Sequence, residues 1–408
     1  MWSHGSVGAQ IGTLILATSI IQLANGFFGT FFSLRVTIEE FHANWAGLVL
    51  SAYFAGFTAG AYFCGRVIAR FGHIRAYAAF AGMVVAATAA MPLLVTPSAW
   101  LILRAIIGFG CAGLFVATES WLNAKAPRSE RGRVFSIYMV GTFVALGFGQ
   151  LLVGRTEIET AAPFNIIVAL FAIALFLVST TRAEQPQSVT EPSLPLGRLP
   201  LMAPVAVAGV ILSGLINGAF YALIPAWMLG EGIESRTIGL VMLSAVLGGL
   251  AFQIPAGRIS DRFDRRIVLS VLGVGLAVAA VGLARLPHTL PVVLPAVAAI
   301  GGLMSTLYPV CVAHAHDRMP ADQVVAVSGQ LILLSGFGSV LGPLIGMTLM
   351  TRFDVNGVLY LMAAAALLLS VIAAIKSLTT ASPPHLERTF DILTPQAAPL
   401  AHDSVRNH

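Results

Sequence analysis

The sequence predicts an all-α membrane protein built from two pseudo-symmetric bundles of six transmembrane helices each, and three observations lead to that prediction. Hydrophobic residues make up 57% of the 408 residues and charged residues only 10%, whereas a soluble domain carries about 25% charged residues. Twelve apolar stretches are long enough to cross a bilayer, which takes roughly 20 residues each. Segments 192 residues apart repeat one another, which indicates two homologous bundles with a central cavity between them.

The twelve expected spans are continuous apolar runs without alternation, which favours helices over a β-barrel. They cover residues 11–34, 45–64, 76–95, 99–122, 134–154, 163–181, 202–229, 237–256, 268–284, 290–315, 324–350 and 356–375. The repeat falls inside them at three places: Asn25-Gly26 returns as Asn217-Gly218, Gly47-Leu48-Val49 as Gly239-Leu240-Val241, and Gly65-Arg66 as Gly257-Arg258. Because each half contains an even number of spans, the two halves run in the same direction through the membrane.

Composition also predicts the domain boundaries. Residues 1–181 form the N-terminal bundle and residues 202–376 the C-terminal bundle. The intervening segment 182–201 is polar and contains four prolines, so we expect a cytoplasmic linker there. Residues 377–408 are polar and rich in proline, which predicts a disordered cytoplasmic tail.

The basic residues predict the orientation in the membrane. Seventeen of the 23 Lys and Arg residues fall on one side if both termini are cytoplasmic, five fall on the other side, and Arg104 lies inside a span. Positive loops face the cytoplasm, so we expect a multi-pass protein of a prokaryotic plasma membrane with both termini inside. The basic pI of about 9.4 is therefore explained by loop residues that meet anionic lipid headgroups. It does not predict that the protein binds nucleic acid.

Two related motifs follow the second and eighth spans. The first reads Gly65-Arg66-Val67-Ile68-Ala69-Arg70-Phe71-Gly72-His73-Ile74-Arg75, and the second reads Gly257-Arg258-Ile259-Ser260-Asp261-Arg262-Phe263-Asp264-Arg265-Arg266. Both resemble G-x-x-x-D-R/K-x-G-R/K-R/K, the signature of the major facilitator superfamily in the loop between helices 2 and 3. The first copy has Ala69 in place of the acid, and the second has Asp264 in place of the second glycine.

Further stretches support this resemblance over residues 10 to 376. Arg104-Ala105-Ile106-Ile107-Gly108-Phe109-Gly110 is similar to the family's R-x-x-x-G-x-G motif, and Glu119-Ser120-Trp121 and Leu307-Tyr308-Pro309 are similar to the uncharacterised YcaD-type members. The resemblance implies the family's fold and alternating access, but no particular substrate. Gly338-x-x-x-Gly342-Pro343-x-x-Gly346 resembles the antiporter motif, yet it lies in the eleventh span where the family has it in the fifth.

Polar residues inside the spans are the candidates for substrate binding. An arginine inside a span costs about 2.5–3.5 kcal/mol on insertion scales, so Arg104 should face the bundle interior or a wet cavity, the alternative being a side chain that extends to the outer surface. Asn25 and Asn217 lie near the middle of their spans, where they could line a cavity or only pack helices together. The full candidate set is Gln22, Asn25, Arg104, Gln150, Ser213, Asn217, Tyr221, Ser305 and Tyr308.

The signature motifs are expected to form a gate on the cytoplasmic side. Their arginines can donate charge-assisted hydrogen bonds to carboxylates or helix ends of the opposite bundle, the alternative being that they only set the topology. Glu119 lies roughly 22 Å beyond Arg104 along the same helix, and we expect it to pair with Arg70 or Arg75. The gate candidates are Gly65, Arg66, Arg70, Gly72, Arg75, Glu119, Gly257, Arg258, Asp261 and Arg262.

The sequence does not suggest an enzyme. It contains no phosphate-binding G-x-x-x-x-G-K-[ST] loop and no nucleophile–base pair, and His314 and His316 do not share a helical face as metal ligands would. We therefore expect no cofactor, no metal and no catalytic residue. The expected function is a monomeric secondary transporter for a small organic solute, with proton-coupled efflux as the leading mode. Uptake of a polar or anionic metabolite, and a sensor or receptor that does not transport, remain alternatives.

Overall fold

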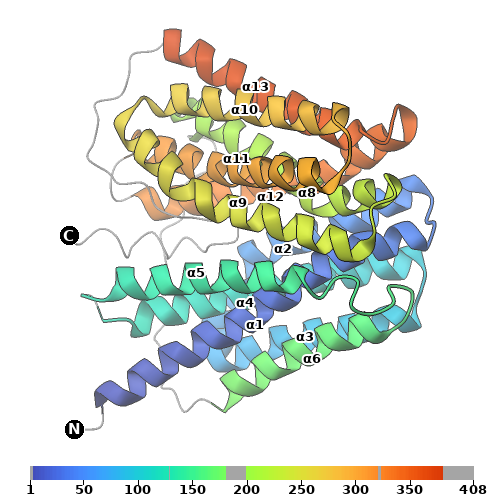
Figure 1. Ribbon diagram of the computed structural model, residues 1–408. Coiled ribbons are helices and arrows are strands. Elements are labelled where there is room, and N and C mark those ends of the chain that lie inside the picture. Colours follow the sequence, from blue (N-terminus) through green and yellow to red (C-terminus); the bar gives the residue numbers. More distant parts are fainter. Residues whose placement is uncertain (1–2, 128, 181–198, 320–322, 380–408) are drawn as a thin grey trace.

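The structure of the protein is a computed structural model that describes residues 3–127, 129–180, 199–319 and 323–379 (Figure 1). All regular elements in these residues are helices. The first half contains α1 (Ser3–Ile38), α2 (Ala43–Phe71), α3 (His73–Ala90), the 3₁₀ turn η1 (Met91–Leu93), α4 (Pro97–Lys125), α5 (Arg131–Gln150) and α6 (Ala162–Ser179). The second contains α7 (Leu199–Met202), α8 (Pro204–Gly230), α9 (Ser235–Arg262), α10 (Arg265–Arg285), α11 (Leu290–His316), α12 (Val324–Arg352) and α13 (Gly357–Thr379).

Twelve of these helices are long and apolar enough to cross a membrane, which confirms the predicted class and number of spans. The duplication also holds for the helix bounds. Adding 192 to the bounds of α2 gives 235–263, and α9 covers Ser235–Arg262. Figure 1 shows helices α1 to α6, coloured blue to green, on one side and helices α8 to α13, coloured lime to red, on the other. The start of α1 and the end of α13 lie at the same end of the molecule.

Several helices extend beyond their predicted ends. The first signature motif was expected in a loop, but α2 continues to Phe71, so that Gly72 alone separates α2 from α3. Gly72 has φ = 80°, a backbone conformation that favours glycine and permits the abrupt turn. The physical reason is that hydropathy reports the length within the hydrocarbon, whereas arginine and other long polar side chains let a helix continue among the headgroups.

The linker and tail predictions fall largely outside the described residues. Of the predicted linker, residues 199–201 belong to the short helix α7, and residues 182–198 lie outside the described part. Of the predicted tail, residues 377–379 still belong to α13, which is a correction, because Leu378 extends the apolar helix three residues past the predicted end of the bundle. Residues 380–408 lie outside the described part.

The Asn-Gly pair of each half lies where two helices of that half cross closely. A Cβ added to Gly26 on α1 would overlap the backbone carbonyl of Leu146 on α5. At the equivalent place in the second half, a Cβ added to Gly218 on α8 would overlap the carbonyl of Ser339 on α12. Small residues allow such close helix contacts in membranes. The glycine of the repeated pair therefore serves packing, which leaves the neighbouring asparagine free for another role.

The two halves contact each other at one end, which we call the joined end. There the Ser33 hydroxyl of α1 donates to the carbonyl oxygen of Ala222 on α8 (2.6 Å). The Ser51 hydroxyl of α2 donates to the carbonyl oxygen of Val340 on α12 (2.8 Å). At the opposite end, which we call the open end, the last residues of α2 and α9, Phe71 and Arg262, are exposed.

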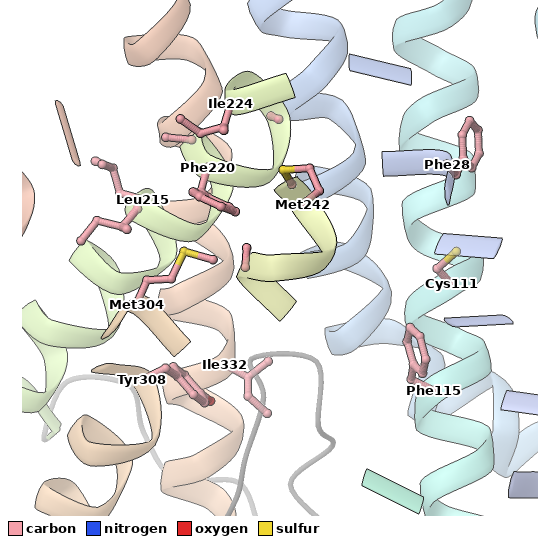
Figure 2. Close-up of a cluster of buried hydrophobic side chains, with 14 of the residues drawn as sticks. Phe28, Cys111, Phe115, Leu215, Phe220, Ile224, Met242, Met304, Tyr308 and Ile332 are labelled. Atoms are coloured by element: carbon pink, nitrogen blue, oxygen red, sulfur yellow. The ribbon is translucent and has the colours of Figure 1, made fainter. Parts of the chain in front are cut away.

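Buried apolar side chains fill the interior of each half. Figure 2 shows Cys111 and Phe115 on α4 at one side of the view and Leu215, Met304 and Tyr308 at the other. The three cysteines of the chain, Cys64, Cys111 and Cys311, are all buried free thiols. This packing holds rigid helices on either side of the space that we describe next.

Candidate functional site

A cavity of about 190 Å³ lies between the two halves. The first half lines it with α1, α2, α4 and α5, and the second half lines it with α8, α9, α11 and α12. Its polar side chains are Gln22, Asn25, Thr30, Thr58, Arg104, Glu119, Thr142, Gln150, Asn217, Gln253, Ser305 and Ser339. Its aromatic side chains are Phe28, Tyr53, Phe54, Phe57, Phe115, Tyr138, Phe143, Tyr221 and Tyr308.

Eight of the nine substrate-binding candidates line this cavity: Gln22, Asn25, Arg104, Gln150, Asn217, Tyr221, Ser305 and Tyr308. Ser213 does not, and this is a correction. Its hydroxyl is fully buried and donates to the carbonyl oxygen of Val210 on its own helix (3.1 Å). Ser and Thr hydroxyls inside helices often donate to a carbonyl of the preceding turn, and this bond uses the one donor of the Ser213 hydroxyl within its own helix.

Arg104 lies inside a group of aromatic rings. Its guanidinium carbon is 4.3 Å from the ring centre of Phe32, 5.0 Å from that of Phe28 and 4.7 Å from that of Tyr53. The residue is only 6% exposed, so its side chain stays in the interior and does not extend to the outer surface. The ring faces offset part of the cost of a buried cation, but rings do not replace the hydrogen bonds that the guanidinium makes in water.

The Nε of Arg104 has no hydrogen-bond partner. Among the described residues, no carboxylate forms an ion pair with this guanidinium, and no oxygen accepts a hydrogen bond from it. A buried charge without a hydrogen-bonded partner is costly and is rarely kept without a function. Arg104 therefore has both the position and the free donors of a binding residue.

Asn25 and Asn217 both line the cavity, and their local partners differ. The Asn25 amide donates to Oε1 of Gln22 (3.3 Å), and its Oδ1 accepts from the Cys111 thiol (3.6 Å). The Asn217 amide donates to the carbonyl oxygen of Ser213 on the preceding turn (2.8 Å). Each asparagine is thus held in place by hydrogen bonds within its own half, at the wall of the cavity.

Glu119 occupies a different place from the one that the sequence suggested. It was expected at the cytoplasmic gate beside Arg70 or Arg75, but it lines the cavity and is only 2% exposed. Its Oε1 accepts a hydrogen bond from the Tyr138 hydroxyl (3.0 Å). Arg70 and Arg75 are exposed at the open end, where Arg70 lies over the Phe71 ring (5.3 Å). The cavity therefore contains a cation and a carboxyl group on the same helix.

Sequence reasoning missed several polar residues of the cavity wall, Tyr53 and Gln253 among them. Tyr53 on α2 is one of the rings around Arg104. Gln253 on α9 is only 2% exposed, and its Nε2 has no hydrogen-bond partner. Both are polar residues within apolar spans, a signal that could have pointed to them, but their spans are the second and eighth, which we did not associate with the cavity.

The other gate candidates lie at the open end. Gly65, Arg66, Arg70, Arg75, Arg258, Asp261 and Arg262 are exposed, and Gly257 is buried. Arg66 lies over the rings of Tyr62 (5.1 Å) and Phe63 (5.5 Å). In the second copy, the buried Arg265 has the stronger pairing, because its Nε lies 2.6 Å from Oδ2 of Asp317. Arg265 was not among our gate candidates.

The described residues contain no group of three or more His, Cys, Asp and Glu side chains that could hold a metal ion. His316 Nε2 lies 2.9 Å from the Ser328 hydroxyl, which is an ordinary hydrogen bond between α11 and α12. The chemistry of the cavity is therefore that of a guanidinium, a carboxyl group, amides, hydroxyls and aromatic faces.

The sequence matches the family model of the Major Facilitator Superfamily over residues 14–234 and again over residues 206–398. It is 30% identical over 346 residues to the Uncharacterized MFS-type transporter YcaD of Escherichia fergusonii, which covers 84% of this chain and 89% of that protein. The protein of the same name from Shigella flexneri serotype 5b is 29% identical over 345 residues, which again cover 84% of this chain and 89% of that protein.

Solved structures share the fold. The crystal structure of a mutant of the nucleoside transporter NupG has a TM-score of 0.79 at 12% identity and covers 90% of this chain and all of that chain. A bacterial homolog of the human lysosomal transporter Spinster has a TM-score of 0.73 at 14% identity and covers 91% of this chain and 96% of that chain. The twelve spans, the two matching halves and these similarities show that the chain belongs to the major facilitator superfamily of membrane transporters.

Proposed function

We propose that this chain carries a small organic solute across a prokaryotic plasma membrane by alternating access, and that proton binding at Glu119 drives the transport. The observation that carries the proposal is the cavity between the halves, which contains Arg104 and Glu119 and lies between a joined end and an open end. Two bundles that rock about a central site are the usual geometry of secondary transport. Such a cycle needs two states that differ by only a few kcal/mol.

The loop arginines predict cytoplasmic termini, and with that orientation the open end faces the cytoplasm. The present conformation would then be the inward-open state. In the outward-open state the signature motifs of α2 and α9 would come together, which is the proposed role of the gate arginines. Their exposure here agrees with a gate that is open.

Glu119 is the residue best suited to couple protons to this movement. A carboxylate deep in a membrane protein is costly unless it is protonated or paired. Glu119 is buried against Tyr138 in a cavity that the two states would open to opposite sides. Proton binding would therefore shift the balance between the states, which is the requirement for coupling.

Spin labels on the closing end test this proposal without a known substrate. In a variant that lacks Cys64, Cys111 and Cys311, we would place labels at the equivalent exposed residues Phe71 and Phe263 and reconstitute the protein in liposomes. We expect two distance populations whose ratio changes between acidic and alkaline pH. Labels at Arg155 and Arg352, near the joined end, should change in the opposite sense.

Glu119→Gln supplies the matched variant, because it keeps the hydrogen bond to Tyr138 but cannot ionise. It should keep both populations and lose their dependence on pH. One unchanging distance at both ends, in every condition, would argue against alternating access and for a sensor or receptor. Movement that stays equally dependent on pH in Glu119→Gln would remove this residue from proton coupling.

Export in exchange for protons is the first direction to test, because Gly338-x-x-x-Gly342-Pro343-x-x-Gly346 resembles the antiporter motif. Uptake of an anionic metabolite is the second candidate, and the free donors of Arg104 in the cavity favour it. Both directions use the same cavity and the same cycle, so the coupling measurement described below distinguishes them.

A further inference from the structure

We infer that the solute is a small organic anion whose anionic group binds Arg104 and whose apolar body lies against the aromatic wall of the cavity. This inference rests on the proposed function, because it names the class of solute that the proposed carrier would take. It is carried by two observations that do not depend on each other, the free guanidinium and the size and composition of the space around it.

The guanidinium lacks a counter-charge from the protein. Arg104 is only 6% exposed, its Nε has no hydrogen-bond partner, and three rings cover it. The carboxyl group in the same cavity, Glu119, lies about 15 residues farther along α4, which is about 22 Å. That distance is too long for an ion pair, so the partner of Arg104 has to come with the ligand.

An anion satisfies this site better than a neutral or cationic group. A carboxylate or sulfonate offers two oxygens in the geometry of the guanidinium fork and forms two charge-assisted hydrogen bonds. A neutral amide supplies an acceptor but leaves the buried charge uncompensated. An ammonium group would be repelled, because like charges in a low-dielectric site interact unfavourably over several ångströms.

The rest of the cavity fits a compact apolar body. Phe54, Phe57, Phe115 and Phe143 all belong to its wall. Its volume of about 190 Å³ exceeds that of an apolar cavity that accommodates benzene, about 150 Å³. The space therefore suits a body of about six carbon atoms beside the anionic group.

A panel of probes matched in size tests the inference. The anions are benzoate, hexanoate and benzenesulfonate, the neutral analogues are benzamide, hexanamide and benzenesulfonamide, and the cation is benzylamine. We would measure the unfolding temperature and the dissociation constant with the purified full-length protein in detergent. At least one anion should bind saturably and raise the unfolding temperature, and it should bind at least tenfold more tightly than its neutral analogue.

Three variants identify the binding group. Arg104→Gln should weaken anion binding about tenfold or more, because hydrogen bonds to charged groups are worth about 1.5–3 kcal/mol and every 1.4 kcal/mol is tenfold. The anion affinity of Arg104→Lys should lie between those of Arg104→Gln and the wild type. Lysine keeps the positive charge but loses the paired N–H donors of the guanidinium. Arg155→Gln, on an exposed loop, should bind as the wild type does.

Several results would overturn the inference. These are binding of the neutral or cationic probes as tight as that of the anions, equal anion binding in Arg104→Gln, and no binding by any anion of the panel. If Arg104→Gln does not fold, the preference of the wild type for anions over neutral analogues decides the question alone.

A transport measurement separates this inference from the proposed function. Benzenesulfonate carries its charge at every working pH, so in proteoliposomes with a pH dye its inward gradient reports coupling directly. Exchange for protons would make the lumen alkaline, and cotransport would make it acidic. If the spin labels change distance but no anion binds, the inference that the solute is an anion is wrong, and the proposal that the protein is a carrier stands. If an anion binds but the label distances never change, the inference about the solute stands, and the proposal of alternating access is wrong.

Discussion

The two halves of the molecule share one helix plan but carry their charged residues in different places. In the first half Arg104 and Glu119 face the cavity. At the equivalent positions, 192 residues later, the second half has Ala296 and Cys311, and its cavity residues, such as Gln253, are neutral. After duplication, the helical scaffold was therefore kept in both copies, whereas the charged residues of the cavity wall are found in only one.

At the open end the difference is reversed. In the second half Arg265 donates to Asp317 (2.6 Å) and Ser260 (2.9 Å), and Arg266 donates to the carbonyl oxygen of Lys376 (2.6 Å). These bonds link α10 to α9, α13 and the C-terminal end of α11. In the first half the signature motif has Ala69 in place of an acid, and its arginines Arg66 and Arg70 lie over aromatic rings near the surface. The second half therefore has a fixed charge network where the first has exposed cations.

The largest expected effect concerns what the halves share. Gly26→Leu or Gly218→Leu places a side chain on a backbone carbonyl that cannot move without separating two helices. Overpacking of this kind typically costs about 1–3 kcal/mol and sometimes more, so we expect little folded protein from either variant. Yield of monodisperse protein and unfolding temperature in detergent would measure the loss in each half.

Gly65→Leu is the matched control, because a Cβ there meets nothing within 4 Å in the present conformation. It should fold normally and have a normal unfolding temperature. In the spin-label measurement it should disfavour closure of the open end, where the motifs would come together. Equal damage from Gly65→Leu and Gly26→Leu would mean that both glycines serve ordinary packing and that our distinction fails.

The second effect concerns the charge network that the halves do not share. Arg265→Gln leaves Asp317 without its partner, and losing one member of a buried ion pair costs about 3 kcal/mol or more. Arg70→Gln removes an exposed arginine of the first half and should change stability by less than about 0.5 kcal/mol. Urea or thermal unfolding of the two variants would measure the difference. Similar losses would show that the first copy also holds a structural network.

The sequence predicted the helix plan because span length and repeat offset are local properties that hydropathy records directly. It predicted that Arg104 lies inside because an arginine within a span is too costly to face lipid. It did not predict that Glu119 lines the cavity, or that Gln253 and Tyr53 do. The reason is that hydropathy does not distinguish a lipid-facing side from a cavity-facing one. Which side of α2, α4 or α9 faces the cavity depends on the rotation that helix packing imposes.

The smallest effect is expected from giving the first signature motif the acid of the second. Ala69→Asp restores the residue equivalent to Asp261 near the end of α2. A negative charge near a helix C-terminus is unfavourable by about 0.3–1 kcal/mol. Attraction to Arg66, three residues earlier, returns about 0.2–0.5 kcal/mol. The unfolding temperature should therefore change little.

The distribution of states is the sensitive measure for Ala69→Asp. If the acid serves the gate, the new carboxylate gains a partner when the arginines of the other motif approach, and closure of the open end is favoured. A gain of about 1 kcal/mol would change the ratio of the two spin-label populations about fivefold. Asn at the same position is the control, since it has the same shape without the charge. An unchanged ratio in both variants would mean that the second half keeps Asp261 for its own fold, as a weak partner of Arg265 (3.5 Å), and that gating does not require the acid in either copy.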